Sequence, residues 1–182
     1  MQRSLPRVPR QQPAGHPADP ETRLTVELAS VVASARRRAA RDGDRQVDTA
    51  HLLHSLVESD PEVRAAFPSG TQVARVLGYL VQRSIGYGLR WRGRVEPHPE
   101  SCRPAEAVAG WSPAAVAAME GARARAEGRG DPRVRGLDLL AELAAHPGSR
   151  AVDVLSHAGV DPLSLTAPAA PPSQQVSRPL RS

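Results

Sequence analysis

The segment QVDTAHLLHSL, residues 46–56, decides the fold, because its skeleton returns as RVRGLDLLAEL at residues 133–143. In both segments a valine is followed by two adjacent leucines and then by a third, which in the first copy are Leu52, Leu53 and Leu56. Leucines at positions i, i+1 and i+4 lie on one face of a helix. Each copy therefore predicts a helix that buries a leucine face, with the preceding valine pointing back into the core.

The two segments belong to a longer internal repeat. A shift of 87 residues carries Val47 onto Val134 and gives 10 identities in the 33 pairs from Leu24 to Leu56. Average composition alone would give about three. Neither copy can cover its apolar stripe alone, so we expect both to pack around one pseudo-twofold core.

Each copy begins with a long helix whose ends are marked. Thr25 is a predicted N-cap and Gly43 closes the first helix. In the second copy Ser112 is the predicted N-cap, Pro113 takes the first helical position and Gly130 ends the helix. Further along, the sequence predicts a helix carrying Val73, Val76, Leu77, Leu80 and Val81, and a short one carrying Ala151, Val154, Leu155 and Ala158.

Composition agrees with an all-α domain. Hydrophobic residues make up 40% of the 182 residues but aromatic residues only 3%, so Leu, Val and Ala must build the core. We expect one domain at residues 22–165, with repeat one at 24–91, a Pro-rich loop at 92–110 and repeat two at 111–165. The Pro-rich tails at 1–21 and 166–182 are predicted to be disordered.

The residue types present exclude several functions. All 24 basic residues are Arg, and without Lys the chain has neither a Walker A loop nor Schiff-base chemistry. The single cysteine, Cys102, excludes an intrachain disulfide and a cysteine-cluster metal site. No apolar run approaches the roughly 20 residues that span a bilayer, and the N-terminus lacks the apolar part of a secretory signal. We therefore expect a cytoplasmic protein without membrane contact.

The repeat resembles the Clp N-terminal domain, the tandem Clp-repeat module of Clp ATP-dependent unfoldases. The resemblance lies in LTVELASVVASARRRAARDGDRQVDTAHLLHSLV and in SPAAVAAMEGARARAEGRGDPRVRGLDLLAEL with AVDVLSHAGVD, which together cover residues 24–165. It implies an all-helical module that binds adaptors, unfolded substrates or tagged peptides and catalyses nothing. This chain would then be a stand-alone version without the ATPase modules.

In some unfoldases of this family a phosphorylated arginine tag is held by a hydroxyl at the start of each repeat and by a glutamate. The hydroxyl positions match Thr25 and Ser112, which would be ligand groups or simple helix caps. The glutamate positions hold Ala50 and Leu137. Because no carboxylate is left to pair with the tag, the resemblance does not extend to phosphoarginine binding.

No catalytic, metal or cofactor site is predicted. His51 and His54 stand three residues apart near Asp48, but a metal needs three or four convergent ligands and the sequence shows no further partner. We expect His51 to pack at its helix start and His54 to be solvated. Arg36, Arg37 and Arg38 are expected on a solvated helix face.

The segment VQRSIGYGLRWRGR, residues 81–94, alternates arginines with Tyr87 and Trp91. Three hypotheses remain open: a helix end whose cations face the helix dipole, a protein interface formed by Tyr79, Tyr87, Arg90 and Trp91, or a nucleic-acid surface at residues 83–94.

The function predicted from the sequence is a non-enzymatic protein- or peptide-binding module, an adaptor or accessory of a Clp chaperone–protease. Its partners would be Clp unfoldase or protease subunits, or a substrate or adaptor polypeptide. The alternative is a small nucleic-acid-binding regulator.

Overall fold

The computed structural model describes residues 23–84, 96 and 110–166. These residues form an all-α fold, as predicted. The elements in chain order are α1 Val26–Asp42, α2 Thr49–Ser59, α3 Pro61–Ala65, α4 Gly70–Gln82, α5 Pro113–Gly128, α6 Gly136–Ala145, α7 Arg150–His157 and a final 3-10 turn, η2 Pro162–Leu165. The predicted tail at 1–21, all of the predicted tail at 166–182 except Thr166, and most of the predicted loop at 92–110 lie outside the described residues.

The long helices α1 and α5 begin and end alike, as the sequence predicts. The Thr25 hydroxyl accepts a hydrogen bond from the Leu28 amide at 3.3 Å, and Ser112 caps α5 through the Ala115 amide at 3.2 Å. After each helix a glycine takes a left-handed conformation, with φ of 73° at Gly43 and 74° at Gly130. A side chain would be strained there, so glycine sets both turns.

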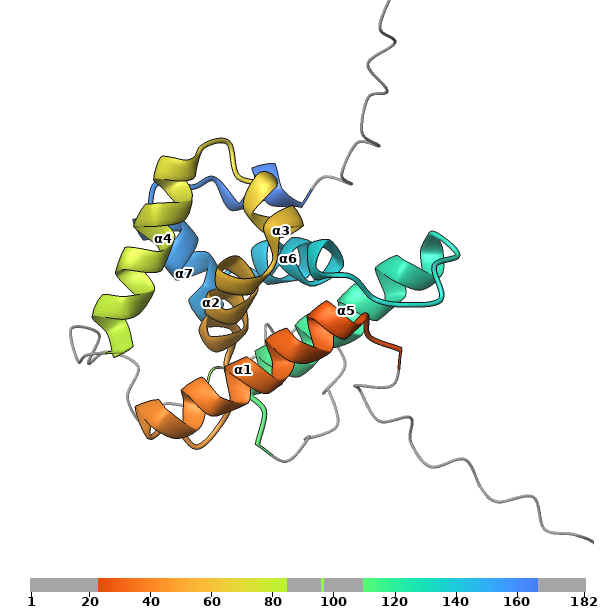
Figure 1. The fold of residues 1–182 in the computed structure, drawn as a ribbon, viewed down its shortest axis with the longest axis horizontal. Coiled ribbons are helices and arrows are strands. Elements are labelled where there is room, and N and C mark those ends of the chain that lie inside the picture. Colours follow the sequence, from red (N-terminus) through yellow and green to blue (C-terminus); the bar gives the residue numbers. More distant parts are fainter. Residues whose placement is uncertain (1–22, 85–95, 97–109, 167–182) are drawn as a thin grey trace, which may run out of the picture.

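The second helices, α2 and α6, form the centre of the molecule (Figure 1). Helices α1 and α5 lie on one side of this pair, and α4 and α7 on the other. The leucines of both skeletons are completely buried in one cluster, and each contributes about 1.5–3 kcal/mol by leaving water. They are Leu52, Leu53, Leu56, Leu139, Leu140 and Leu143. The two repeats therefore share a single core, as predicted.

Two short backbone pairings join the repeats at their beginnings. Leu24 pairs in parallel with Val134, and Val47 pairs in parallel with Trp111. Adding 87 to Leu24 gives position 111, and adding 87 to Val47 gives Val134, so each pairing is the symmetry equivalent of the other. Both valines are buried and point into the core, as predicted. The pseudo-twofold relation is thus visible in backbone hydrogen bonds as well as in helix packing.

The repeats differ after their second helices. Helix α4 buries Val73, Val76 and Leu80 against the core. Val81, predicted on the same stripe, is 50% exposed, because it lies one residue beyond Leu80 and about 100° further round the helix. Helix α7 buries Ala151, Val154 and Leu155, and Ala158 follows it into the core, as predicted.

One glycine permits a close approach between the repeats. Gly136 begins α6, and a Cβ added there would overlap the carboxylate of Asp60 and lie 3.2 Å from a methyl group of Leu56. Asp60 is held in place because its Oδ1 accepts hydrogen bonds from the amides of Glu62 and Val63 at the start of α3. The first turn of α6 can therefore lie against α2 and α3 only without a side chain at position 136.

Among the described residues, every helix is too short or too polar to cross a bilayer.

Candidate functional site

The two candidate hydroxyls, Thr25 and Ser112, both serve as helix caps in the structure. Ser112 is additionally withdrawn from solvent, at 1% exposure, and its hydroxyl donates to Glu96 at 2.9 Å. Its oxygen therefore already accepts from the α5 backbone while its proton goes to a carboxylate. Thr25 remains partly exposed at the start of α1. The two hydroxyls thus differ in burial and in hydrogen-bond partners, although they stand at equivalent positions of the repeat.

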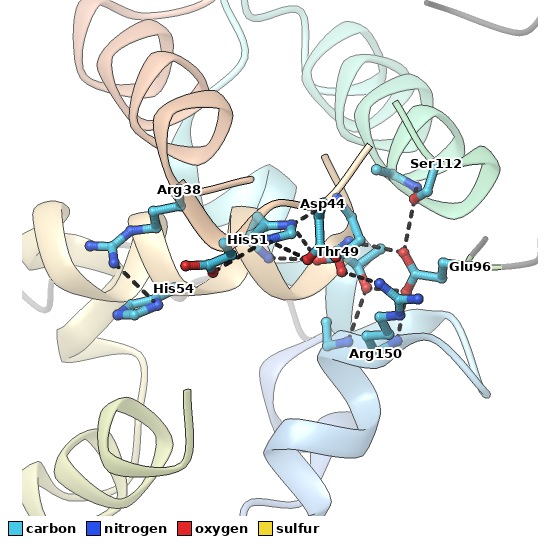
Figure 2. Close-up of polar contacts among 12 residues, drawn as sticks. Arg38, Asp44, Thr49, His51, His54, Glu96, Ser112 and Arg150 are labelled. Atoms are coloured by element: carbon cyan, nitrogen blue, oxygen red, sulfur yellow. Dashed lines mark hydrogen bonds and ion pairs between the residues drawn. The ribbon is translucent and has the colours of Figure 1, made fainter. Parts of the chain in front are cut away.

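Glu96 is a buried carboxylate that the sequence did not single out. It accepts hydrogen bonds from the backbone amides of Thr49 at 2.9 Å and Arg150 at 2.6 Å, besides those from the hydroxyls of Ser112 and Thr49. These donors stand at the N-termini of α2, α5 and α7, where a negative charge is stabilised by the helix dipoles. Figure 2 shows the carboxylate between them. In the sequence, only its place directly before Pro97 could have drawn attention to it.

Asp48 is the second buried carboxylate, and two arginines converge on it. Its Oδ2 accepts from Arg83 at 2.7 Å and from the guanidinium of Arg150. Burial alone would raise the pKa of this carboxyl, but the hydrogen bond from His51 and the neighbouring positive charges outweigh it. The pKa of Asp48 is therefore held well below its ordinary value, and the side chain stays charged inside the protein. This ion cluster ties the starts of α2 and α7 to the end of α4.

His51 packs at the start of α2, as predicted, with 2% of its surface exposed. Its amide donates to Asp48 Oδ1 at 2.8 Å, which completes the cap of α2. The structure corrects the expectation that no further partner stands near this ring: Nε2 lies 3.3 Å from Asp44 Oδ2 and 3.7 Å from Asp42 Oδ2. The left-handed turn at Gly43 folds the end of α1 back against α2, a contact that sequence spacing does not reveal.

His54 is buried rather than solvated, which corrects a second prediction. Only 6% of the residue is exposed, and Arg38 Nη1 stands 3.3 Å from its Nδ1. Burial, followed by the charge of Arg38, lowers the pKa of His54 to about 4. The same contact corrects the expectation for Arg38, which also pairs with Glu58 and is only 14% exposed in its side chain. Helix α2 lies so close to α1 that one edge of the expected solvated face is covered.

The arginine–aromatic segment is described only at its beginning. Tyr79 stacks on His157 of α7 with ring centroids 5.1 Å apart. Arg83 is ion-paired with Asp48 and stands 3.7 Å from Asp44, so the structure gives it a role inside the protein. Tyr87, Arg90 and Trp91 lie outside the described residues. The nucleic-acid hypothesis therefore stays a prediction that depends on arginines from Arg90 onward.

The two positions at which the Clp family carries glutamates are now placed. Ala50 is completely buried in α2, and Leu137 is partly buried against the core. Neither position offers a carboxylate, and Glu96 is already fully engaged with four donors. The expectation that phosphoarginine binding does not extend to this chain stays a prediction.

The helical repeats, their reciprocal pairing and the buried leucine core together define a Clp N-domain-like fold. The N-terminal domain of the caseinolytic protease-associated chaperone ClpD from Arabidopsis thaliana matches with a TM-score of 0.53 and 18% sequence identity, covering 79% of this chain and 90% of that chain. A chain described in structural investigations of a malarial protein secretion system matches with a TM-score of 0.54 and 14% identity, covering 78% of this chain and 89% of that one. No protein-family model and no curated protein matches the sequence. The likeness is thus one of fold.

Proposed function

We propose that this protein is a non-enzymatic protein-binding module that serves a Clp ATP-dependent chaperone–protease as an adaptor or accessory. The observation that carries the proposal is the fold shared with the N-terminal domain of ClpD over 79% of this chain and 90% of that chain. The second neighbour, whose title concerns a protein secretion system, is also compatible with a protein-handling role.

The distribution of polar groups supports binding over catalysis. Glu96 and Asp48, two buried carboxylates, are saturated by helix N-termini and arginines. Such groups hold the two repeats together and are poorly suited to proton transfer, because they already accept several hydrogen bonds. A rigid domain of this kind can present its outer helices to a partner without rearranging.

The binding surface is proposed at the end of α4 and in the segment that follows it. Val81 is 50% exposed there, and Tyr79, two residues earlier on the same helix, is partly exposed. The sequence then adds Tyr87, Arg90 and Trp91. Tyrosine, arginine and tryptophan contribute most often to the energy of protein interfaces. Thr25 and Ser112 are of less weight in this proposal, because both already serve as caps.

A pull-down with purified Clp unfoldase and protease subunits tests the proposal. The full chain should retain one of them at moderate salt, and replacing Tyr87 and Trp91 by alanine should weaken retention. Val26→Ala is a matched control, because Val26 is also an exposed apolar residue but lies at the start of α1, outside the proposed surface. If the full chain retained neither subunit, the proposed role in a Clp system would be rejected. If Val26→Ala weakened retention as much as the Tyr87 and Trp91 replacements did, the proposed position of the binding surface would be rejected.

A further inference from the structure

The clusters at the starts of α2 and α6 occupy equivalent positions but carry different charges. The shift of 87 residues carries Asp44 onto Asp131 and His51 onto Asp138, but it carries Asp42 onto Arg129. In repeat two the guanidinium of Arg129 lies between both carboxylates: Nη2 donates to Asp131 at 3.0 Å and to Asp138 at 2.8 Å. A positive charge therefore joins the end of α5 to the start of α6.

Repeat one carries Asp42 at the position of that arginine, keeps an aspartate at Asp44, and has His51 at the position of Asp138. At the equivalent place Asp42 and Asp44 both face Nε2 of His51, at 3.7 and 3.3 Å. Nε2 is buried and has no hydrogen-bond partner among the described residues. One ligand atom each of Asp44, Asp48 and His51 lies within 4.8 Å of the others. A buried nitrogen that faces carboxylates without a hydrogen bond is a costly arrangement unless a cation lies between them.

The other nitrogen of the ring indicates which form His51 takes. Nδ1 stands 2.8 Å from Asp48 Oδ1, to which it can donate, and 3.2 Å from the Asp48 amide, which can donate to Nδ1 only when that nitrogen carries no proton. The shorter distance favours an Nδ1–H that donates to the carboxylate, which leaves the lone pair of neutral His51 on Nε2. A carboxylate that orients a histidine in this way is the usual outer partner of a metal-binding imidazole.

The local charges also leave room for a cation. The guanidinium groups of Arg83 and Arg150 both bind Asp48, and no ion pair to Asp42 is seen for either among the described residues. Arg83 stands farther from Asp44, at 3.7 Å. Among the described residues, both guanidinium groups thus lie against Asp48, whereas Asp44 lies beside Nε2 of His51 (Figure 2).

We propose that Nε2 of His51 and the carboxylates of Asp44 and Asp42 bind a divalent transition-metal ion, Zn²⁺ in particular, with Asp48 orienting the ring. One imidazole with carboxylate oxygens suits Zn²⁺, whereas Ca²⁺ and Mg²⁺ prefer sites made of oxygen alone. Water would complete the coordination. The ion would tie the end of α1 to the start of α2, as Arg129 ties α5 to α6, and its role is structural.

The test is a titration of the metal-stripped full chain with Zn²⁺, followed by isothermal calorimetry and by thermal unfolding. The pair of variants is Asp44→Asn and Asp131→Asn, which remove the same group from the two equivalent clusters. We expect one tight site, raised thermal stability on adding Zn²⁺, and affinity reduced at least tenfold in Asp44→Asn but unchanged in Asp131→Asn. Weak binding by histidines or Cys102 elsewhere would persist in both variants and be subtracted.

The proposal would be overturned if Asp44→Asn bound Zn²⁺ as tightly as the unsubstituted chain does. It would also be overturned if Zn²⁺ left the temperature of unfolding unchanged. In either case a proton on Nε2, rather than a metal ion, would lie between His51 and the carboxylates. If Asp44→Asn does not fold, Co²⁺ bound to the unsubstituted chain decides the matter. We expect the bound Co²⁺ to show the visible absorption of a low-symmetry site. This absorption should disappear when one equivalent of Zn²⁺ displaces the Co²⁺, and it should be weaker in Asp42→Asn. A spectrum like that of hydrated Co²⁺ would overturn the proposal.

Discussion

Leu24, just ahead of the first helix, pairs through its backbone with Val134 of the second repeat. The flanking amides make this pairing reciprocal: Thr25 donates to the Val134 carbonyl at 3.0 Å and Val134 donates to the Arg23 carbonyl at 2.8 Å. The equivalent bonds, from Ser112 to Val47 at 2.9 Å and from Val47 to Gly110 at 2.8 Å, close the other side. Each repeat thus completes the beginning of the other, and neither half retains all of its backbone bonds alone.

The shared core predicts that damage in either repeat destabilises the whole domain. Leu52→Ala and Leu139→Ala should each lower the free energy of unfolding by about 2–5 kcal/mol, because both side chains are completely buried. Denaturant unfolding followed by circular dichroism should show one transition in each variant. Leu163→Ala, at a residue 73% exposed, should change stability by less than about 0.5 kcal/mol. Two separate transitions would mean that the repeats have independent cores.

The contact at Gly136 predicts opposite effects of the same substitution in two helices. Gly136→Ala should destabilise the domain by about 1–3 kcal/mol, because the new methyl group overlaps the anchored carboxylate of Asp60. Gly128→Ala should instead stabilise it by about 0.5–1 kcal/mol, because its methyl group meets nothing and alanine favours the helix. Urea denaturation measures both, and a neutral Gly136→Ala would show that α6 and α3 are not in close contact.

Glu96 is predicted to hold three helix N-termini together. Glu96→Ala removes the acceptor of two amides and two hydroxyls, so we expect a loss of about 2 kcal/mol or more, since buried donors would lack a partner. Glu120→Ala, at an exposed position of α5, is the control. Chemical denaturation measures the difference. If both variants were equally stable, the carboxylate of Glu96 would not be buried at this junction in solution.

His54 predicts a pH dependence of stability with a definite sign. Its pKa is lowered to about 4 in the folded protein, against an ordinary value of 6.5. Between these values the unfolded chain binds the proton and the folded protein does not, so the contribution of His54 to stability falls as the pH falls from 6.5 to 4. His54→Gln should flatten the curve of unfolding free energy against pH in that window. The same substitution at exposed His157 is the control, and an unchanged slope in His54→Gln would contradict the buried, neutral form.

The features that follow from local sequence were predicted correctly. The caps at Thr25 and Ser112 and the turns at Gly43 and Gly130 depend on residues a few positions apart, and the repeat itself identifies the leucine core. The features that the sequence missed join distant segments. Burial of His54 depends on how closely α1 lies on α2, and the role of Glu96 depends on three helix starts meeting at one point. The spacing of apolar residues along the sequence does not predict contacts between such distant segments.

The affinity of the full chain for purified Clp unfoldase subunits is the decisive measurement for the proposed recognition of a Clp machine. Calorimetric titration with the full chain should give a saturable complex that persists at moderate salt and weakens at least tenfold when Tyr87 and Trp91 are replaced by alanine, but not in Val26→Ala. Absence of binding to both the unfoldase and the protease subunits would contradict the account. The nucleic-acid alternative would be favoured instead if the chain bound nucleic acid with an affinity that falls steeply as salt rises. That binding would have to be lost when Arg90, Arg92 and Arg94 are replaced.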